Sequence, residues 1–290
     1  MKILIVGSKG QVGAALVQQC NENITLLALD SKKLDITDQV AVNAAVLKFD
    51  PDYIINAAAY TAVDKAETEV DLAWRVNRDG PRFLAQAAKK VDATIIHLST
   101  DYVFSGGGDG SYVESDIPAP QSVYGESKFA GECEVINVCE KHIIIRTAWV
   151  FGENGNNFVK TMLRLGSERE ELGVVADQFG GPTYAGDIAA VIYKIINQLQ
   201  AGANKRWGIY HFSGQPYVSW CEFAKSIFSN AEKFKILKQT PIVNAIPTES
   251  YPTPARRPSN SRLNCDKIGR NFGIVASNWQ VALENIQAYK

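Results

Sequence analysis

The chemistry suggested by this sequence begins with a tyrosine and a lysine four residues apart. Tyr124 and Lys128 stand in the segment Tyr-Gly-Glu-Ser-Lys, and on a helix such residues share one face, with Cβ atoms about 5–6 Å apart. Hydride reduction of a carbonyl leaves an alkoxide that needs a proton, and a phenol with a pKa of about 10 supplies one readily only when nearby positive charge lowers that pKa. The pair predicts an acid for carbonyl reduction, although an amphipathic helix without chemistry can have the same spacing.

A threonine at the end of a predicted strand could share this task. The strand predicted over Thr94–Leu98 continues into Ser-Thr-Asp-Tyr, so that Thr100 lies at the carboxyl end of a parallel strand, where open α/β sheets bind ligands. Its hydroxyl could bind the same carbonyl oxygen as Tyr124 and orient it for proton transfer. The small residues of Asn56-Ala57-Ala58-Ala59, after another strand, leave room for a cofactor or form a close-packed strand end.

A glycine-rich turn near the N-terminus predicts a phosphate-binding loop. Gly7, Gly10 and Gly13 follow the first apolar strand and precede a helix that contains Gln11 and Val12. Such glycines allow a tight turn and close approach of the backbone to a pyrophosphate, which the helix N-terminus attracts. The spacing is GxxGxxG rather than GxGxxG, and a plain strand-to-helix turn is the alternative. Because the turn stands at the start of a βαβ pattern, a loop that binds a dinucleotide is favoured over a plain turn.

Asp30 ends the second predicted strand, 17 residues after Gly13. A carboxylate at this position can accept hydrogen bonds from the adenosine ribose and repels a 2′-phosphate, which favours NADH. The following Ser31, Lys32 and Lys33 could offset that repulsion and admit NADPH. Alternatively, Asp30 only caps the next turn.

The elements that must position these residues alternate along the first half of the chain. Nearly continuous apolar runs predict buried parallel strands over Lys2–Val6, Ile24–Leu29, Tyr53–Asn56, Thr94–Leu98 and Ile143–Arg146. Amphipathic patterns between them predict helices over Gln11–Cys20, Thr37–Phe49, Val70–Lys90 and Val123–Cys139. This rhythm predicts an α/β fold with a Rossmann-type, doubly wound parallel sheet.

The second half predicts a smaller C-terminal substrate-binding lobe. We divide the chain into a dinucleotide-binding domain over residues 1–150 and a lobe over residues 151–290, from which some elements could return to the first sheet. The lobe has predicted helices over Asn157–Arg169, Asp187–Leu199 and Ser219–Ser229 and strands over Val174–Ala176 and Gly208–Phe212. Four prolines predict an irregular loop over 247–258, and four glycines predict a mobile loop over 105–111 that closes on substrate.

The composition argues against several other classes of protein. The 290 residues are 46% hydrophobic and 21% charged, with a net charge of −1, which is ordinary globular usage and gives no electrostatic reason to bind nucleic acid or a membrane surface. No stretch resembles a signal or a transmembrane span, so we expect a cytoplasmic protein. Five scattered cysteines and three histidines predict reduced thiols and no metal site.

The motifs also resemble a known group of enzymes. The glycine spacing and Tyr124-x-x-x-Lys128 resemble the extended short-chain dehydrogenase/reductases. Four longer segments resemble the dTDP-4-dehydrorhamnose reductase family: NAAAYTAVDKAE over 56–67, STDYVF over 99–104, RTAWV over 146–150 and YPTPARRPxxSxL over 251–263. The resemblance implies reduction of the C4 ketone of dTDP-4-dehydro-β-L-rhamnose by NADH or NADPH, with a small nucleotide sugar as the binding partner.

The same resemblance implies site residues. Those for the cofactor are Gly7, Gly10, Gln11, Val12, Gly13, Asp30, Asp35, Ile36, Ala59, Tyr60, Thr61 and Leu98, with Tyr124 and Lys128. Those for the sugar are Thr100, Asp101 and Trp149, and the catalytic set is Thr100, Tyr124 and Lys128. Arg257 is either a partner of the diphosphate or a plain surface arginine.

This sequence departs from the family's pattern at the positions that bind a metal ion in some members. Some members of the family form a homodimer around Mg²⁺ held by glutamates, where this chain has small residues, among them Ala15 and Gly186. Because Mg²⁺ is held through carboxylates, the bridge is doubtful and we expect a monomer or weak homodimer. Two other functions stay open, a dinucleotide-binding regulatory subunit similar to the methionine adenosyltransferase beta subunit and another reductase, epimerase or dehydratase acting on nucleotide sugars.

Overall fold

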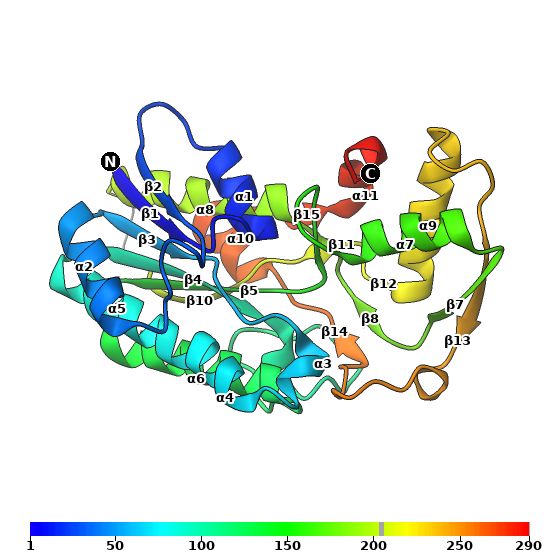
Figure 1. The fold of residues 1–290 in the computed structure, drawn as a ribbon, viewed down its shortest axis with the longest axis horizontal. Helices are drawn as coiled ribbons and strands as arrows, with labels where there is room; N and C mark the ends of the chain where they lie inside the picture. The colour runs from blue at the N-terminus through cyan, green and yellow to red at the C-terminus, as the bar shows by residue number, and fades with distance from the viewer. Residues whose placement is uncertain (203–205, 290) are drawn as a thin grey trace.

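The computed structural model describes residues 1–202 and 206–289, and a six-stranded parallel sheet forms its centre (Figure 1). The strands are β1 (Lys2–Val6), β2 (Thr25–Leu29), β3 (Tyr53–Asn56), β4 (Thr94–Thr100), β5 (His142–Thr147) and β10 (Gly208–His211). They pair in parallel in the order β10-β5-β4-β3-β1-β2. All of β3 and β5 is buried, which explains the nearly continuous apolar runs.

Helices cover both faces of this sheet. One face is packed by α1 (Gln11–Gln18), α8 (Ala185–Gln200) and α10 (Asp266–Phe272), and the other by α2 (Gln39–Phe49), α5 (Gly80–Lys90) and α6 (Val123–Val138) (Figure 1). Side chains at cap positions start two of these helices, Asp38 before α2 and Ser122 before α6. The predicted doubly wound α/β fold is confirmed.

The strand order places a ligand crevice between β1 and β3. From β1 the chain adds β2 on one side, and β3, β4, β5 and β10 follow on the other. This is the doubly wound order whose direction reverses between the first and third strands, and ligands bind at such a reversal, outside the carboxyl ends of the strands. Gly7 and Ala57 follow the two strands at this point.

The prediction of one continuous α-helix over Val70–Lys90 is wrong in the middle of that range. The structure has α4 (Val70–Trp74), a π-helical turn over Arg75–Asp79 and then α5. An α-helical bond from residue 81 to the carbonyl of Asn77 cannot form, because Pro81 has no N–H. A short α3 (Val63–Ala66) precedes this region.

The second half forms a lobe beside the sheet and also returns to it. The lobe elements, to the right in Figure 1, are β7 (Glu171–Val175), β13 (Ile242–Ile246), α7 (Phe158–Glu168), α9 (Trp220–Lys233) and α11 (Trp279–Leu283). The second half of the chain also contains two-residue strands, which are β6 (Val150–Phe151), β8 (Phe179–Gly180), β9 (Thr183–Tyr184), β11 (Gly214–Gln215), β12 (Val218–Ser219), β14 (Asn260–Ser261) and β15 (Ser277–Asn278). The elements α8, β10 and α10 belong to the first sheet, and the division at residue 150 stays a prediction.

Two predicted loops are tied to the rest of the fold. The proline-rich segment contains a 3₁₀ turn over Thr248–Ser250 and is otherwise irregular up to β14, as its prolines predict. The glycine-rich loop over 105–111 is bonded to the chain around β14: the Gly106 carbonyl accepts from Ser259 Oγ at 2.7 Å and the Gly110 carbonyl from Asn260 Nδ2 at 2.7 Å. Its closure over substrate stays a prediction. Among the described residues, no helix is long and apolar enough to cross a membrane.

Candidate active site

The glycine segment after β1 packs directly against the end of β3. Gly7 has a φ of +76°, and a Cβ there would lie 2.5 Å from the backbone nitrogen of Ala58. A Cβ on Gly13 would lie 2.1 Å from the Gly7 carbonyl oxygen. No other residue type fits either position without movement of the backbone. The crowding keeps α1 close to the sheet, and the N–H groups of its first turn can receive an anion.

The residues expected around the adenosine lie at the end of β2. The buried Asp30 carboxylate accepts hydrogen bonds from the backbone N–H groups of Lys32 and Lys33, both at 3.1 Å. Asp35 is exposed and accepts from the Thr37 hydroxyl at 2.8 Å, and Ile36 is buried. Their roles toward a cofactor stay predictions.

A residue that the sequence analysis missed holds the segment of Ala59, Tyr60 and Thr61 in place. Asn77, in the π-helical turn, accepts from the Tyr60 N–H at 2.8 Å and donates to the Tyr60 carbonyl at 3.1 Å. It also donates to Ser127 Oγ on α6 at 3.1 Å. The segment after β3 is thereby bonded to the helix of Tyr124 and Lys128. The Asn-Arg-Asp-Gly-Pro sequence inside a predicted helix is the one signal that could have indicated this turn.

Thr100, Tyr124 and Lys128 come together at the carboxyl end of β4. Thr100 is the last residue of that strand, and the other two lie on the first turns of α6. The Tyr124 hydroxyl lies beside the Thr100 side chain, and Lys128 Nζ donates to the Leu98 carbonyl at 2.7 Å. All three side chains are at least nine-tenths buried. The structure therefore brings these three residues together, and their catalytic role stays a prediction.

Burial controls the electrostatics of this group. It raises the pKa of the Tyr124 phenol well above its ordinary value, and the adjacent Thr100 side chain offsets part of that rise. It also lowers the pKa of Lys128 to about 8 and raises that of Asp101 to about 6. The lowering of the tyrosine pKa expected from nearby positive charge is not found in this structure, where burial is the largest cause of the shift.

Two tryptophans far apart in the sequence form a platform next to this group. Trp149, directly after β5, has a φ of +49° and stacks on Trp220 of α9, with ring centroids 3.5 Å apart and planes at 12°. Trp220 was missed, since nothing local links it to Trp149. It lines a cavity of about 580 Å³ whose other walls include Tyr102, Phe158, Arg164, Tyr251 and Arg257.

Arg257 lies between this cavity and the strand ends. Its guanidinium forms an ion pair with Asp64 at 2.8 Å, and its positive charge offsets part of the burial-driven rise in the pKa of the Tyr102 phenol. The arginine is therefore held at the cavity wall rather than free on the surface.

Comparison with known proteins identifies the family. The family model for the RmlD substrate binding domain matches residues 1–289. A dTDP-4-dehydrorhamnose reductase from Aggregatibacter actinomycetemcomitans is 51% identical over 290 residues, covering 99% of both chains. The chain belongs to the dTDP-4-dehydrorhamnose reductase family.

Solved structures of the family agree with this fold. A dTDP-4-dehydrorhamnose reductase from Clostridium acetobutylicum superposes with a TM-score of 0.91 at 40% identity, over 99% of this chain and 98% of that one. One from Bacillus anthracis, solved in complex with NADP, has the same TM-score and identity over 100% and 99% of the two chains.

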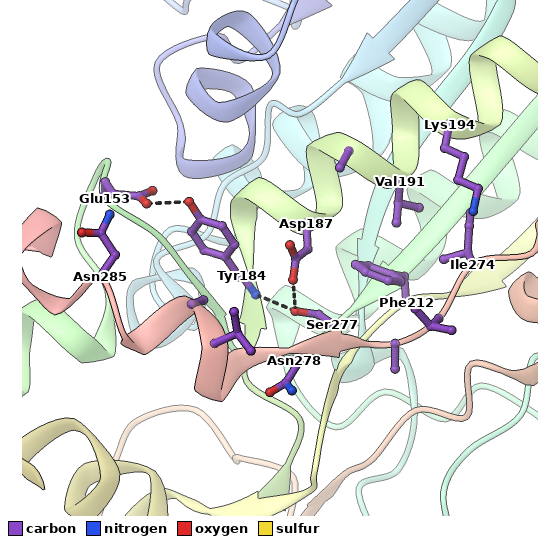
Figure 2. A pocket seen from close by; sticks show the side chains of 15 residues that line it. Glu153, Tyr184, Asp187, Val191, Lys194, Phe212, Ile274, Ser277, Asn278 and Asn285 are labelled. Atoms are coloured by element: carbon purple, nitrogen blue, oxygen red, sulfur yellow. Dashed lines mark hydrogen bonds between the residues drawn. The ribbon is translucent and has the colours of Figure 1, made fainter. Parts of the chain in front are cut away.

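The residues Thr100, Tyr124 and Lys128 are called the reductase group below. A second cavity of about 580 Å³ lies away from this group, between α8, β15 and α11 (Figure 2). Its carboxylates are engaged within the chain: Asp187 accepts from Ser277 Oγ at 2.6 Å, and Glu153 accepts from the Tyr184 hydroxyl at 2.5 Å (Figure 2). At the neighbouring positions noted in the sequence, Ala15 is buried and the Gly186 carbonyl accepts from Gln19 Nε2 at 2.8 Å. A bridging metal would find no carboxylate at these two positions.

Chelation should therefore leave this member of the family unchanged. We expect EDTA to alter neither its turnover nor its mass in solution, because Mg²⁺ is held through carboxylates that Ala15 and Gly186 cannot supply. Light scattering and a rate assay with and without EDTA measure both quantities. A drop from dimer to monomer on chelation would contradict the prediction.

Proposed function

We propose that this chain reduces the C4 ketone of dTDP-4-dehydro-β-L-rhamnose to dTDP-L-rhamnose, with NADH or NADPH as the reductant. The observation that carries the proposal is the buried group of Thr100, Tyr124 and Lys128 at the end of β4, close to the crevice bounded by Gly7 and Ala58. The crowded glycines and the N-terminus of α1 suit a dinucleotide pyrophosphate. When bound, the reduced nicotinamide supplies the hydride.

Each residue of the group has a distinct role. Tyr124 donates its phenolic proton to the oxygen that becomes the C4 hydroxyl, and Thr100 binds the same oxygen and orients it. The Lys128 ammonium lies one helical turn away and stabilises the phenolate that forms. The low water access of this buried group strengthens both interactions.

The sugar nucleotide is proposed to span from this group to the cavity. Asp101 Oδ2 is buried without a hydrogen-bond partner among the described residues, so it is available to a sugar hydroxyl. Arg257, at the cavity wall, is placed to exchange Asp64 for the diphosphate. The aromatic walls formed by Tyr102 and Trp220 suit a nucleobase.

A spectrophotometric assay tests the proposal. The pure protein is mixed with NADH or NADPH, with and without the 4-keto sugar nucleotide, and the loss of cofactor absorbance is followed. We expect oxidation only when the sugar nucleotide is present. Absence of turnover, combined with copurification of a partner enzyme, would support the regulatory-subunit alternative, and equilibration of stereoisomers without net cofactor oxidation would support an epimerase.

The choice of cofactor depends on Asp30 in this proposal. Replacing Asp30 with Asn removes a negative charge beside the proposed 2′-phosphate position, so the ratio of kcat/KM for NADPH to that for NADH should rise by about fivefold. Steady-state kinetics with both cofactors gives this ratio. An unchanged ratio would mean that Asp30 serves only the turn after β2.

The compartment and assembly are proposed from the same chemistry. Because the substrate and cofactor are small water-soluble anions, we propose that the enzyme acts in the cytoplasm with no nucleic-acid or membrane partner. Because Ala15 and Gly186 supply no carboxylate for a metal bridge, we propose that it is a monomer or weak homodimer.

A further inference from the structure

The last residue of β5 carries a buried hydroxyl that is left without a partner. Thr147 is 7% exposed, and its Oγ1 has no hydrogen-bond partner among the described residues. The nearby Thr183 hydroxyl, by contrast, donates to the Ala148 carbonyl at 2.7 Å and accepts from the Gly214 N–H at 3.1 Å. Because buried hydroxyls are as a rule hydrogen-bonded, the Thr147 hydroxyl is available to a bound ligand.

The register of the sheet places this hydroxyl beside Thr100. Thr147 and Thr100 are paired residues of the parallel strands β5 and β4, so their side chains point to the same face, about 4.8 Å apart. The pair before them in this row, Leu98 and Ile145, packs in the core that contains α1. Thr147 therefore lies on the α1 face of the sheet, next to the residue that orients the ketone in the proposed reaction.

The chain after Thr147 is also bonded to the N-terminus of α1. Gln11, the first residue of that helix, donates from Nε2 to the Val150 carbonyl at 3.4 Å and accepts on Oε1 from Asn157 Nδ2 at 3.1 Å. These bonds fix the end of β5 relative to the glycine segment. A dinucleotide with its pyrophosphate at α1 and its nicotinamide beside Thr100 therefore lies along the edge of the sheet that carries Thr147.

We propose that Thr147 is a cofactor-binding residue whose hydroxyl hydrogen-bonds to the carboxamide of the nicotinamide. The inference rests on the proposed function. A carboxamide has N–H donors and a carbonyl acceptor, and a threonine hydroxyl can serve as the partner of either. The bond fixes the rotation of the ring beside the ketone that Thr100 orients, and transfer between two carbon atoms needs them about 3–3.5 Å apart.

The other buried oxygens at this edge are less suited to the task. Ser99 Oγ and Asp101 Oδ2 also have no partner among the described residues. Ser99 comes one residue before Thr100 and pairs with Arg146, whose side chain forms an ion pair with α6, so Ser99 points to the opposite face of the sheet. Asp101 lies in the turn after β4 and is assigned above to a sugar hydroxyl. Thr147 is the one of the three that lies on the α1 face within β5.

Equilibrium binding separates the nicotinamide from the rest of the ligands. Dissociation constants for NADH, NADPH, ADP-ribose and dTDP-L-rhamnose are measured by calorimetry for the wild type, Thr147→Val and Thr147→Ser. We expect Thr147→Val, which removes the hydroxyl and keeps the shape, to weaken NADH and NADPH equally, by about fivefold. ADP-ribose, which lacks the nicotinamide, and the sugar nucleotide should stay within about twofold of the wild type. Thr147→Ser keeps the hydroxyl and should restore cofactor binding to within about twofold.

A matched control is the same replacement at the other end of β4. Thr94 is buried at the first position of that strand, so Thr94→Val should change none of the four constants. If Thr147→Val does not fold, Thr147→Ala deletes the same hydroxyl and carries the same expectations.

Three results would overturn the role of Thr147 and leave the reductase proposal intact. These are unchanged cofactor binding by Thr147→Val, equal weakening of ADP-ribose, and weakening of dTDP-L-rhamnose alone, which would assign the hydroxyl to the sugar. Failure of the wild type to bind NADH and NADPH would overturn the proposed function and this inference together.

Discussion

Tyr124→Phe should lower turnover by about 10²–10⁴, the usual contribution of a general acid. The substitution removes the phenolic proton and keeps the ring, which packs edge-to-face on Tyr102 with centroids 5.3 Å apart. Because the lost group acts in the transition state, kcat should fall while the dissociation constants of cofactor and sugar nucleotide change little. Steady-state kinetics and calorimetry separate these quantities.

A second tyrosine serves as the control for this experiment. The Tyr217 hydroxyl donates to the Leu263 carbonyl at 2.7 Å and lies outside the reductase group. Tyr217→Phe also removes a phenolic hydroxyl, here with a part-buried hydrogen bond, so it should cost some stability and leave kcat near that of the wild type. Turnover of Tyr124→Phe close to the wild-type value would remove Tyr124 from its role as the acid.

Glu132→Ala should lower the free energy of unfolding by about 3–5 kcal/mol. Glu132 lies one turn after Lys128 on α6 and pairs with Arg146 of β5 through two hydrogen bonds of 2.6 and 2.9 Å. Both side chains are essentially inaccessible, at 0% and 1% exposure. Removal of the carboxylate leaves the guanidinium buried without its counter-charge, and it also loosens the helix that positions Tyr124.

An exposed ion pair provides the comparison for Glu132. Arg164 and Glu168 pair at 3.0 Å on α7, with side chains 61% and 51% exposed. Glu168→Ala should cost at most about 1 kcal/mol, because solvent screens the pair. Urea denaturation of both variants measures the difference. A loss below about 1 kcal/mol for Glu132→Ala would show that the buried pair adds little to stability.

Local sequence was sufficient to predict most of what forms the reductase group. The strand over Lys2–Val6 and its glycine turn follow from neighbouring residues, since burial on both faces demands apolar runs and a tight turn demands glycine. The pairing of Tyr124 with Lys128 follows from helical periodicity, and the order of strands and helices places Thr100 at the ligand edge of the sheet. The motifs carried by these same elements were sufficient to suggest the family.

Tertiary structure alone decided the contacts between distant segments. Residues with no shared local pattern are joined by the stacking of Trp149 on Trp220, the pairing of Lys9 with Asp30 and the hydrogen bond from Asn77 to Ser127 on α6. The return of α8, β10 and α10 to the first sheet has the same cause, because apolar helices and strands in the second half fit either lobe until the packing of the whole chain selects one. Periodicity determines which face of an element is buried, whereas only the folded chain determines what that face is buried against.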